Sequence, residues 1–277
     1  MADVYEFRRR LGKIFETAFR VEDIAESLIS FDAERPVAEI LALSQTNRLR
    51  VAGVRERGVI CGYIATSELG DAAGVCGDYR REFDDAEVIA ADADLSQTIR
   101  ALSKRQRLFV TAFGKVNGIV TWTDLQKPSV RMWLFGVITM IEMAFTQMID
   151  SWFPDDEWKR LMTKSRLRKA ELLLDERRRR NEGGEVRLLD CLQFSDKGQI
   201  LTKDEDARRL MGMSSKTAGD RLIRDLGSLR DSLAHSQDIV TRGWEVIVIM
   251  AERFDEILRF GSTFQVRRRS VFPEGEE

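Results

Sequence analysis

The sequence is poor in the residues that most often carry metal or nucleophilic chemistry. It has a single histidine, His235, and three cysteines, Cys61, Cys76 and Cys191, which lie far apart. Scattered cysteines without metal-ligand spacing argue against a zinc site and indicate a reducing compartment, so we expect a cytoplasmic protein with no bound metal. Because imidazole titrates near neutral pH, His235 is the one place where we expect acid–base chemistry by histidine.

Other common signals are missing as well. The sequence has no GxxxxGK(S/T) loop and no GxGxxG after a predicted strand, which argues against kinase chemistry. Ser232 and the cysteines have no second histidine and no oxyanion signature with them, so we do not expect a nucleophilic hydrolase. The first six residues are polar and acidic, unlike a signal peptide. The net charge is −2, so RNA binding would need a local basic patch.

The sequence does have enough apolar material for about two domains. Of its 277 residues, 43% are hydrophobic and 32% are charged, which is typical of a soluble globular protein. Residues 132–149 form an apolar run that approaches the length of a membrane span. Glu142 lies at its centre and would be costly in lipid. We therefore expect a buried bundle helix and no membrane partner, with Glu142 either neutral or paired with an arginine, for which Arg230 is a candidate.

A pattern of strands and helices occurs twice in the N-terminal half. The first copy has a helix and then two strands joined by a short turn, at residues 37–41, 49–54 and 59–64. The second copy has a strand, a helix and two more strands, at residues 88–91, 95–102, 108–113 and 116–121. Such self-similarity predicts an internal repeat and an α/β module.

The second copy ends in Gly118-Ile119-Val120-Thr121-Trp122-Thr123-Asp124, which fits the Gly-hydrophobic-x-Thr-x-x-Asp ending of CBS domains. Residues 20–128 resemble a tandem CBS pair, a Bateman module. The resemblance implies an adenine nucleotide such as AMP or ATP as regulatory ligand, with Asp124 accepting hydrogen bonds from the ribose hydroxyls and Thr121 on the phosphate side. The first copy has Ala65 and Glu68 at the matching positions, so we expect one site per chain. The alternative is that Asp124 only caps a helix.

From residue 129 to 262 the sequence predicts helices that pack as a bundle. The expected helices are Val130–Trp152, Glu157–Asn181, Val186–Gln193, Glu205–Met211, Lys216–Ala234 and Trp244–Phe260. Residues 1–19 predict a separate N-terminal helix, and residues 263–277 a charged tail without fixed structure. The predicted fold class is therefore α+β, with a CBS-like module followed by an all-α domain.

The stretch Arg230-Asp231-Ser232-Leu233-Ala234-His235 resembles the Arg-x4–6-His signature of HEPN ribonucleases, which are helical bundles that dimerise and join two such motifs. The resemblance implies metal-independent RNA cleavage through a 2′,3′-cyclic phosphate. His235 would act as acid or base, Arg230 would neutralise charge on the phosphorane, and Asp231 would orient either side chain. The alternative is an ordinary helix end, where histidine favours the negative pole of the helix.

Residues 159–180 carry ten lysines or arginines against three acids, and this stretch ends in Arg177-Arg178-Arg179-Arg180. The arginines are either RNA contacts or a solvated helix end. The leading hypothesis is an adenine-nucleotide-sensing module that regulates a HEPN endoribonuclease, with no required cofactor. One histidine per chain cannot supply both acid and base, so this hypothesis predicts a homodimer. The alternative is a non-catalytic, CBS-gated module that binds nucleotide or protein partners.

Overall fold

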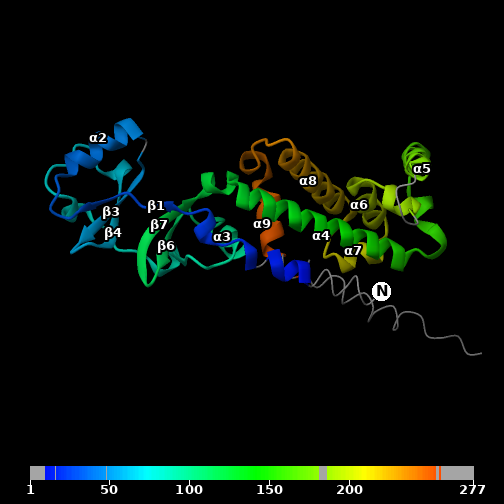
Figure 1. The fold of residues 1–277 in the computed structure, drawn as a ribbon, viewed down its shortest axis with the longest axis horizontal. Coiled ribbons are helices and arrows are strands. Elements are labelled where there is room, and N and C mark those ends of the chain that lie inside the picture. The colour runs from blue at the N-terminus through cyan, green and yellow to red at the C-terminus, as the bar shows by residue number, and fades with distance from the viewer. Residues whose placement is uncertain (1–9, 16, 48, 181–185, 254–255, 257–277) are drawn as a thin grey trace, which may run out of the picture. The chain divides into compact units, whose positions relative to one another are not determined.

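A computed structural model of the chain describes residues 10–15, 17–47, 49–180, 186–253 and 256. The chain divides into two compact units, each with its own internal contacts. The repeat unit is Glu16–Arg131, and the helical unit is Met132–Glu277 together with Met1–Phe15. The fold is mixed α+β, with the strands in the repeat unit (Figure 1). The predicted tail 263–277 and the first nine residues of the predicted N-terminal helix lie outside the described residues.

The repeat unit contains two small sheets. The three-stranded sheet has the order β2-β3-β4, with strands at Ser30–Asp32, Val51–Glu56 and Val59–Ala65. The four-stranded sheet has the order β1-β7-β6-β5, with strands at Glu26–Ser27, Lys115–Thr121, Arg107–Ala112 and Val88–Ala90. In each sheet a short strand pairs in parallel with the first strand of a hairpin. Helices α2 (Val37–Asn47) and α3 (Leu95–Leu102) connect them, so the predicted internal repeat is confirmed.

The two hairpins match each other in detail. Each has a two-residue turn in which both residues have positive φ, Arg57-Gly58 in one and Phe113-Gly114 in the other. Such turns match the right-handed twist of the flanking strands, and glycine takes the second position without strain. Each hairpin also has a register irregularity at the same place, after Val54 and after Val110. The repeat therefore extends to turn type and bulge position.

Aromatic side chains join the two copies. Tyr63 of β4 and Phe109 of β6 have ring centroids 4.7 Å apart, and Phe83 lies edge-on to Phe109 at 4.6 Å. Phe109 is fully buried. The Tyr63 hydroxyl donates to the Glu87 carboxylate at 3.3 Å, so the polar group of this mostly buried side chain has a hydrogen-bond partner. This aromatic cluster connects one strand of each sheet and so stabilises the packing of the two copies against each other.

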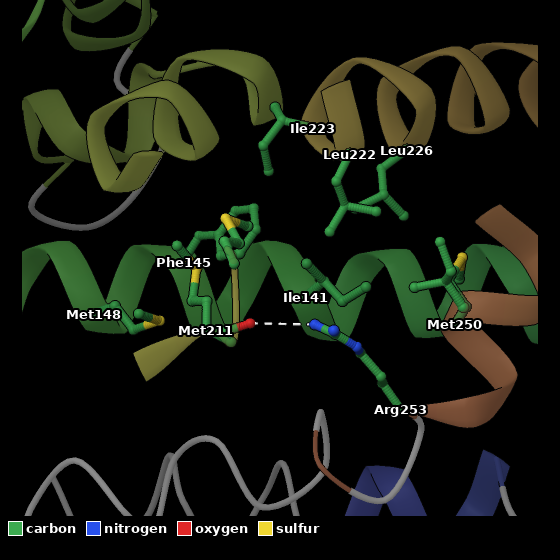
Figure 2. A pocket seen from close by; sticks show the side chains of 12 residues that line it. Ile141, Phe145, Met148, Met211, Leu222, Ile223, Leu226, Met250 and Arg253 are labelled. Carbon is green, nitrogen blue, oxygen red and sulfur yellow. Dashed lines mark hydrogen bonds between the residues drawn. The ribbon is translucent and has the colours of Figure 1, made fainter. Parts of the chain in front are cut away.

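The helical unit confirms the prediction of a helical C-terminal part. Its helices are α4 (Pro128–Trp152, which starts in the repeat unit), α5 (Lys164–Arg179), α6 (Phe194–Lys203), α7 (Glu205–Leu210), α8 (Lys216–Ala234) and α9 (Val240–Glu252). Two 3₁₀ segments, η6 (Pro154–Leu161) and η7 (Leu188–Cys191), lie between them. An apolar pocket lies among α4, α8 and α9 (Figure 2). The described N-terminal residues 10–15 are helical, and Phe15 lies against Gly136 of α4.

Three of the predicted helices have wrong bounds. The last one, expected from Trp244, starts at Val240 as α9, and its expected end at Phe260 lies outside the described residues. The expected helix Glu157–Asn181 is split, because η6 ends at Leu161, Met162 has an extended backbone and Thr163 caps a new helix, α5. The expected helix Val186–Gln193 is a single 3₁₀ turn, and α6 follows it unpredicted. Glycine at position 198 lowers the helix propensity of α6, but a Cβ there would lie 2.6 Å from Ile223 of α8. Close packing of α6 on α8 therefore overrides local propensity.

Helix α4 is long and apolar enough to cross a membrane by length and composition, and 61% of its most apolar window is buried inside the structure. Its largest fully buried side chain is Trp133, whereas Met132 and Phe135 are exposed. Pro128 is the first residue of this helix, where its missing N–H costs no hydrogen bond. The apolar run 132–149 thus forms the long central part of α4.

Two matching glycines give a test of the repeat: Gly62 precedes Ala65 by three residues in the first copy, as Gly118 precedes Thr121 in the second. A Cβ on Gly62 would lie 2.3 Å from the Arg81 carbonyl oxygen, and one on Gly118 would lie 3.1 Å from the Glu26 carbonyl oxygen. We expect Gly62→Ala to lower the free energy of unfolding by about 1–3 kcal/mol, and Gly118→Ala by less. Urea unfolding measures both. Gly227→Ala on α8 is the control, since nothing lies within 4 Å of it and alanine favours a helix. Equal costs at Gly62 and Gly118 would contradict the prediction.

Candidate functional sites

The CBS-like motif forms a tight turn at the end of β7. Thr121 is the N-cap of a short 3₁₀ helix, η5 (Trp122–Gln126). The carboxylate oxygen Oδ2 of Asp124 accepts from the Thr121 backbone N–H at 2.8 Å and from its hydroxyl at 3.0 Å. The hydroxyl oxygens of Thr121 and Thr123 are 2.8 Å apart. The structure thus brings Thr121 and Asp124 together, as the motif predicts.

The second oxygen of Asp124 faces Lys127, whose ammonium lies 3.0 Å away. The ammonium also donates to the Ile24 carbonyl at 2.6 Å and to the Glu26 carboxylate. Burial by itself would lower the pKa of Lys127, but the hydrogen bonds to Glu26 and Asp124 outweigh burial and raise it. Lys127 therefore stays charged and connects η5 to the chain segment around β1.

Asp124 is 6% exposed and receives three hydrogen bonds from the chain itself. A carboxylate offers about four lone-pair positions, so room for about one more donor remains. The capping role, which was one of the two interpretations of the motif, is present in the structure. The ribose-binding role stays a prediction.

Arg107 is a candidate site residue that the sequence did not single out. It is the register partner of Thr121 across the β6–β7 pair, and paired positions share one face of a sheet. Its guanidinium lies 5.0 Å from the centroid of the Tyr63 ring. The Nε atom is buried and has no hydrogen-bond partner among the described residues. An unpaired buried donor on a cation is costly, and an anion would satisfy it.

The first copy is apolar at the matching positions. Val51 and Ala65 are register partners there, and both are buried. Glu68, which stands where the motif has aspartate, is exposed and pairs with Arg81. The second copy thus has an arginine and a threonine at the pair of positions where the first copy has two hydrocarbon side chains.

Trp122 lies inside the motif and is 38% exposed. Its indole N–H donates to the Leu102 carbonyl at 3.1 Å and to the Arg105 carbonyl at 3.3 Å. These hydrogen bonds anchor the indole at the end of α3 while part of its surface faces solvent.

The HEPN-like motif lies at the end of α8. Ser215 caps the start of this helix, and His235 is its C-cap residue. The His235 side chain is exposed, and its backbone N–H donates to the Asp231 carbonyl at 3.0 Å. The Arg230 guanidinium donates to the Asp231 carboxylate at 3.0 Å and lies 5.9 Å from the centroid of the Phe194 ring. Of the two orienting roles predicted for Asp231, the contact in this chain is with Arg230.

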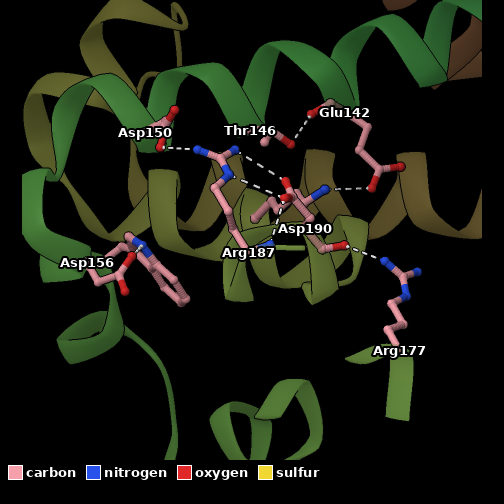
Figure 3. Close-up of polar contacts among 9 residues, drawn as sticks. Glu142, Thr146, Asp150, Asp156, Arg177, Arg187 and Asp190 are labelled. Carbon is pink, nitrogen blue, oxygen red and sulfur yellow. Dashed lines mark hydrogen bonds and ion pairs between the residues drawn. The ribbon is translucent and has the colours of Figure 1, made fainter. Parts of the chain in front are cut away.

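Glu142 does not pair with Arg230, so that expectation is wrong. Its carboxylate lies 3.0 Å from the Lys197 ammonium of α6 (Figure 3). The Lys197 side chain is 7% exposed and that of Glu142 is 33% exposed. Lys197 is therefore the more deeply buried partner, and Glu142 compensates its charge. Arg230 is held at Asp231 and Phe194 instead.

The four consecutive arginines end α5 and begin the following turn. Arg177, which is half-buried, donates to the Asp190 carbonyl at 3.4 Å, and Arg180 pairs with Glu176. Arg178 and Arg179 are exposed. These contacts suit a helix C-terminus, where cations are favoured. RNA contact by this stretch stays a prediction.

Arg187 joins the same region to α4. It pairs with Asp150 at 2.8 Å and with Asp190 at 3.3 Å (Figure 3). The hydrogen bonds that the Arg187 guanidinium donates to the carboxylates of Asp190 and Asp150 raise its pKa.

The described residues contain no group of three or more His, Cys, Asp or Glu side chains that could hold a metal ion. The three cysteines are free thiols. Burial raises the pKa of Cys76 and of Cys191, so these two thiols stay protonated at neutral pH and are poor nucleophiles.

No protein-family model matches the chain. No curated protein matches it either. Several solved structures resemble it in part. The CBS domain of a bacterial CNNM/CorC family Mg²⁺ transporter in complex with ATP covers 45% of this chain and 96% of its own, at 17% identity and a TM-score of 0.35. The match with CBSX2 in complex with AMP covers 41% of this chain and 98% of that chain, at 19% identity and a TM-score of 0.36. The match with TA0289, a CBS domain protein of unknown function from Thermoplasma acidophilum, covers 42% of this chain and 75% of that chain. The identity is 21% and the TM-score is 0.33.

The Glu142–Lys197 pair predicts an asymmetry in stability. Glu142→Leu leaves a buried ammonium without an anion, so we expect the free energy of unfolding to fall by about 3 kcal/mol. Lys197→Met leaves a carboxylate that water reaches, and we expect a loss within about 1 kcal/mol. Urea unfolding of the two variants and of the double variant measures the effects and their coupling. A larger loss for Lys197→Met than for Glu142→Leu would show that the burial order is reversed.

Proposed function

We propose that the repeat unit binds an adenine nucleotide such as AMP or ATP and that the helical unit is a HEPN-type, metal-independent endoribonuclease under its control. The nucleotide site is carried by one observation, the unpaired Nε of Arg107 beside Thr121 at the end of the Gly118–Asp124 motif. The polar groups there are a cation and two hydroxyls, from Thr121 and Thr123, which suit a phosphate group. We place the phosphate at Arg107 and Thr121.

The ribose would lie at Asp124. Because this carboxylate has room for about one more donor, it accepts one ribose hydroxyl and not both, provided that Lys127 keeps its place. The exposed part of Trp122 offers a surface on which a purine could stack. The apolar pair Val51 and Ala65 provides no matching contacts in the first copy, which supports one site per chain.

The nuclease proposal is supported by the exposure of His235 and by the position of Arg230 one to two turns before it on the same helix. In the proposed reaction the ribose 2′-oxygen forms a bond to the adjacent phosphorus, and the bond from phosphorus to the 5′-oxygen breaks. A base takes the 2′-hydroxyl proton, and an acid gives a proton to the leaving 5′-oxygen. Arg230 neutralises the charge that builds up on the phosphoryl oxygens. The nucleophile belongs to the RNA itself.

The two proton transfers require two groups of suitable pKa, and the chain has one histidine. A second copy of the chain would supply the other imidazole, so the proposal includes a homodimer with Arg230 and His235 of both copies at one site. The arginines Arg177–Arg180 are candidate contacts to the RNA backbone, since each would act on phosphate regardless of base sequence.

A cleavage assay tests the nuclease proposal. Purified protein incubated with total RNA in EDTA should yield fragments that end in 2′,3′-cyclic phosphate. His235→Ala should lower the rate by about 10²- to 10⁴-fold, because a positioned acid or base contributes that much. Arg224→Ala is the matched control, since Arg224 is an exposed arginine on α8 outside the motif. Sedimentation of the same preparation should show a dimer. Equal rates for wild type and His235→Ala would overturn the proposal.

Ribose analogues test the nucleotide site without disturbing the Asp124 cap. We expect AMP to bind in calorimetry at one site per chain. Of 2′-deoxy-AMP and 3′-deoxy-AMP, one should bind about tenfold more weakly, because it lacks the hydroxyl that donates to a charged acceptor. The other should bind like AMP. Equal affinity for all three nucleotides would place the ribose away from Asp124.

One observation favours the non-catalytic alternative. Within the described residues no hydrogen bond or ion pair holds the His235 imidazole, whereas catalytic histidines are usually oriented by a partner. In that case the chain is a regulatory module that binds nucleotide and a partner without cutting RNA. The cleavage assay separates the two functions, since the alternative predicts nucleotide binding with no His235-dependent fragments.

A further inference from the structure

The apolar pocket of the helical unit takes no part in the functions proposed above. Its volume is about 580 Å³, including the space at its opening. It lies among α4, α8, α9 and the turn that follows α7, and its walls include Phe145, Leu222 and Met250 (Figure 2). Pockets that bind small molecules have mostly apolar walls and a few polar groups that orient the ligand.

Methionine is prominent in the lining. Eleven of the twelve lining residues are apolar, and four of these are methionines: Met148, Met211, Met213 and Met250. A methionine side chain is unbranched and polarizable, so it adjusts to the shape of what it contacts. The walls therefore suit a flexible hydrocarbon chain better than a rigid ring system with polar edges.

Arg253 is the one charged residue of the lining. It follows the end of α9, and its Nη1 donates to the Met211 carbonyl at 3.2 Å (Figure 2). This is its one side-chain hydrogen bond within the described residues, and no described carboxylate pairs with it. A guanidinium has five N–H donors in a planar fork that matches a carboxylate. Most of these donors are thus left for a ligand.

We propose that this pocket binds a small amphiphile with an apolar chain and a single carboxylate. The hydrocarbon lies among the methionines and Phe145, and the carboxylate pairs with Arg253. Burial of the chain provides the affinity, and the charge-assisted pair at the opening selects the anionic head group. A cationic head group is disfavoured by the same guanidinium.

Methyl NMR on the full-length protein with ¹³C-methyl methionine tests this proposal. Decanoate is the probe, and decanol is its uncharged match. Decanoate should shift the methyl signals of Met148, Met211, Met213 and Met250 in a saturable way. The exposed Met132 serves as internal control and should not move. Arg253→Gln, which keeps a donor near the Met211 carbonyl, should weaken decanoate about tenfold and leave decanol unchanged.

Three results would overturn the proposal. Absence of shifts at the four lining methionines up to millimolar decanoate would show that the pocket does not take such a ligand. Shifts of the same size at Met132 would show general association of an amphiphile with apolar surface. If decanol binds as tightly as decanoate and Arg253→Gln changes neither, the anionic selectivity is wrong.

Discussion

The carboxylate of Asp124 fixes the segment at which the repeat unit passes into helix α4. Its two oxygens hold the backbone and hydroxyl of Thr121 on one side and the Lys127 ammonium on the other. Pro128 then starts α4 with no break in the chain. A buried carboxylate is stable here because each oxygen receives donors, one of which carries charge. The position of the turn 121–127, and of the candidate groups that it carries, depends on this one side chain.

The comparison between the two copies indicates which end of the repeat unit would bind a ligand. The copies share their parallel strand, hairpin turn and bulge, so differences between them are not imposed by the fold. At one matching pair, hydrocarbon in the first copy is replaced in the second by Arg107 and Thr121. A guanidinium with an unpaired buried donor is unfavourable in an empty site and favourable beside an anion. This asymmetry supports a single anionic ligand per chain.

Elements with strong local signals were predictable from the sequence. The hairpins have short, mostly apolar strands and two-residue turns with glycine, and α8 has leucines at helical spacing with a serine cap. Strand β2 was missed because it has three residues and is defined by its pairing with β3. Helix α6 was missed because Gly198 weakens its propensity, and packing on Ile223 decides its structure.

In the candidate sites, too, residues with a local sequence signal could be predicted and contacts between distant segments could not. The motif residues Thr121 and Asp124 could be found from their spacing, whereas the hydrogen bond that Lys127 donates to Asp124 could not be predicted from composition. Arg107 has no local signal, since its role follows from the register of β6 against β7. The partner of Glu142 was misassigned to Arg230 because the sequence did not predict α6, which carries Lys197. Long-range pairing therefore determines the parts that sequence reasoning missed.

The central claim is that nucleotide binding in the repeat unit controls cleavage by the helical unit. The direct measurement is the single-turnover rate of cleavage of one labelled RNA as AMP is titrated, beside calorimetry on the same protein. A coupling free energy of about 1–3 kcal/mol would change the rate about five- to 150-fold if activity follows the population of the active state. We predict a change of severalfold, in either direction, whose midpoint coincides with the dissociation constant of AMP. A rate that stays constant while AMP saturates its site would contradict the claim.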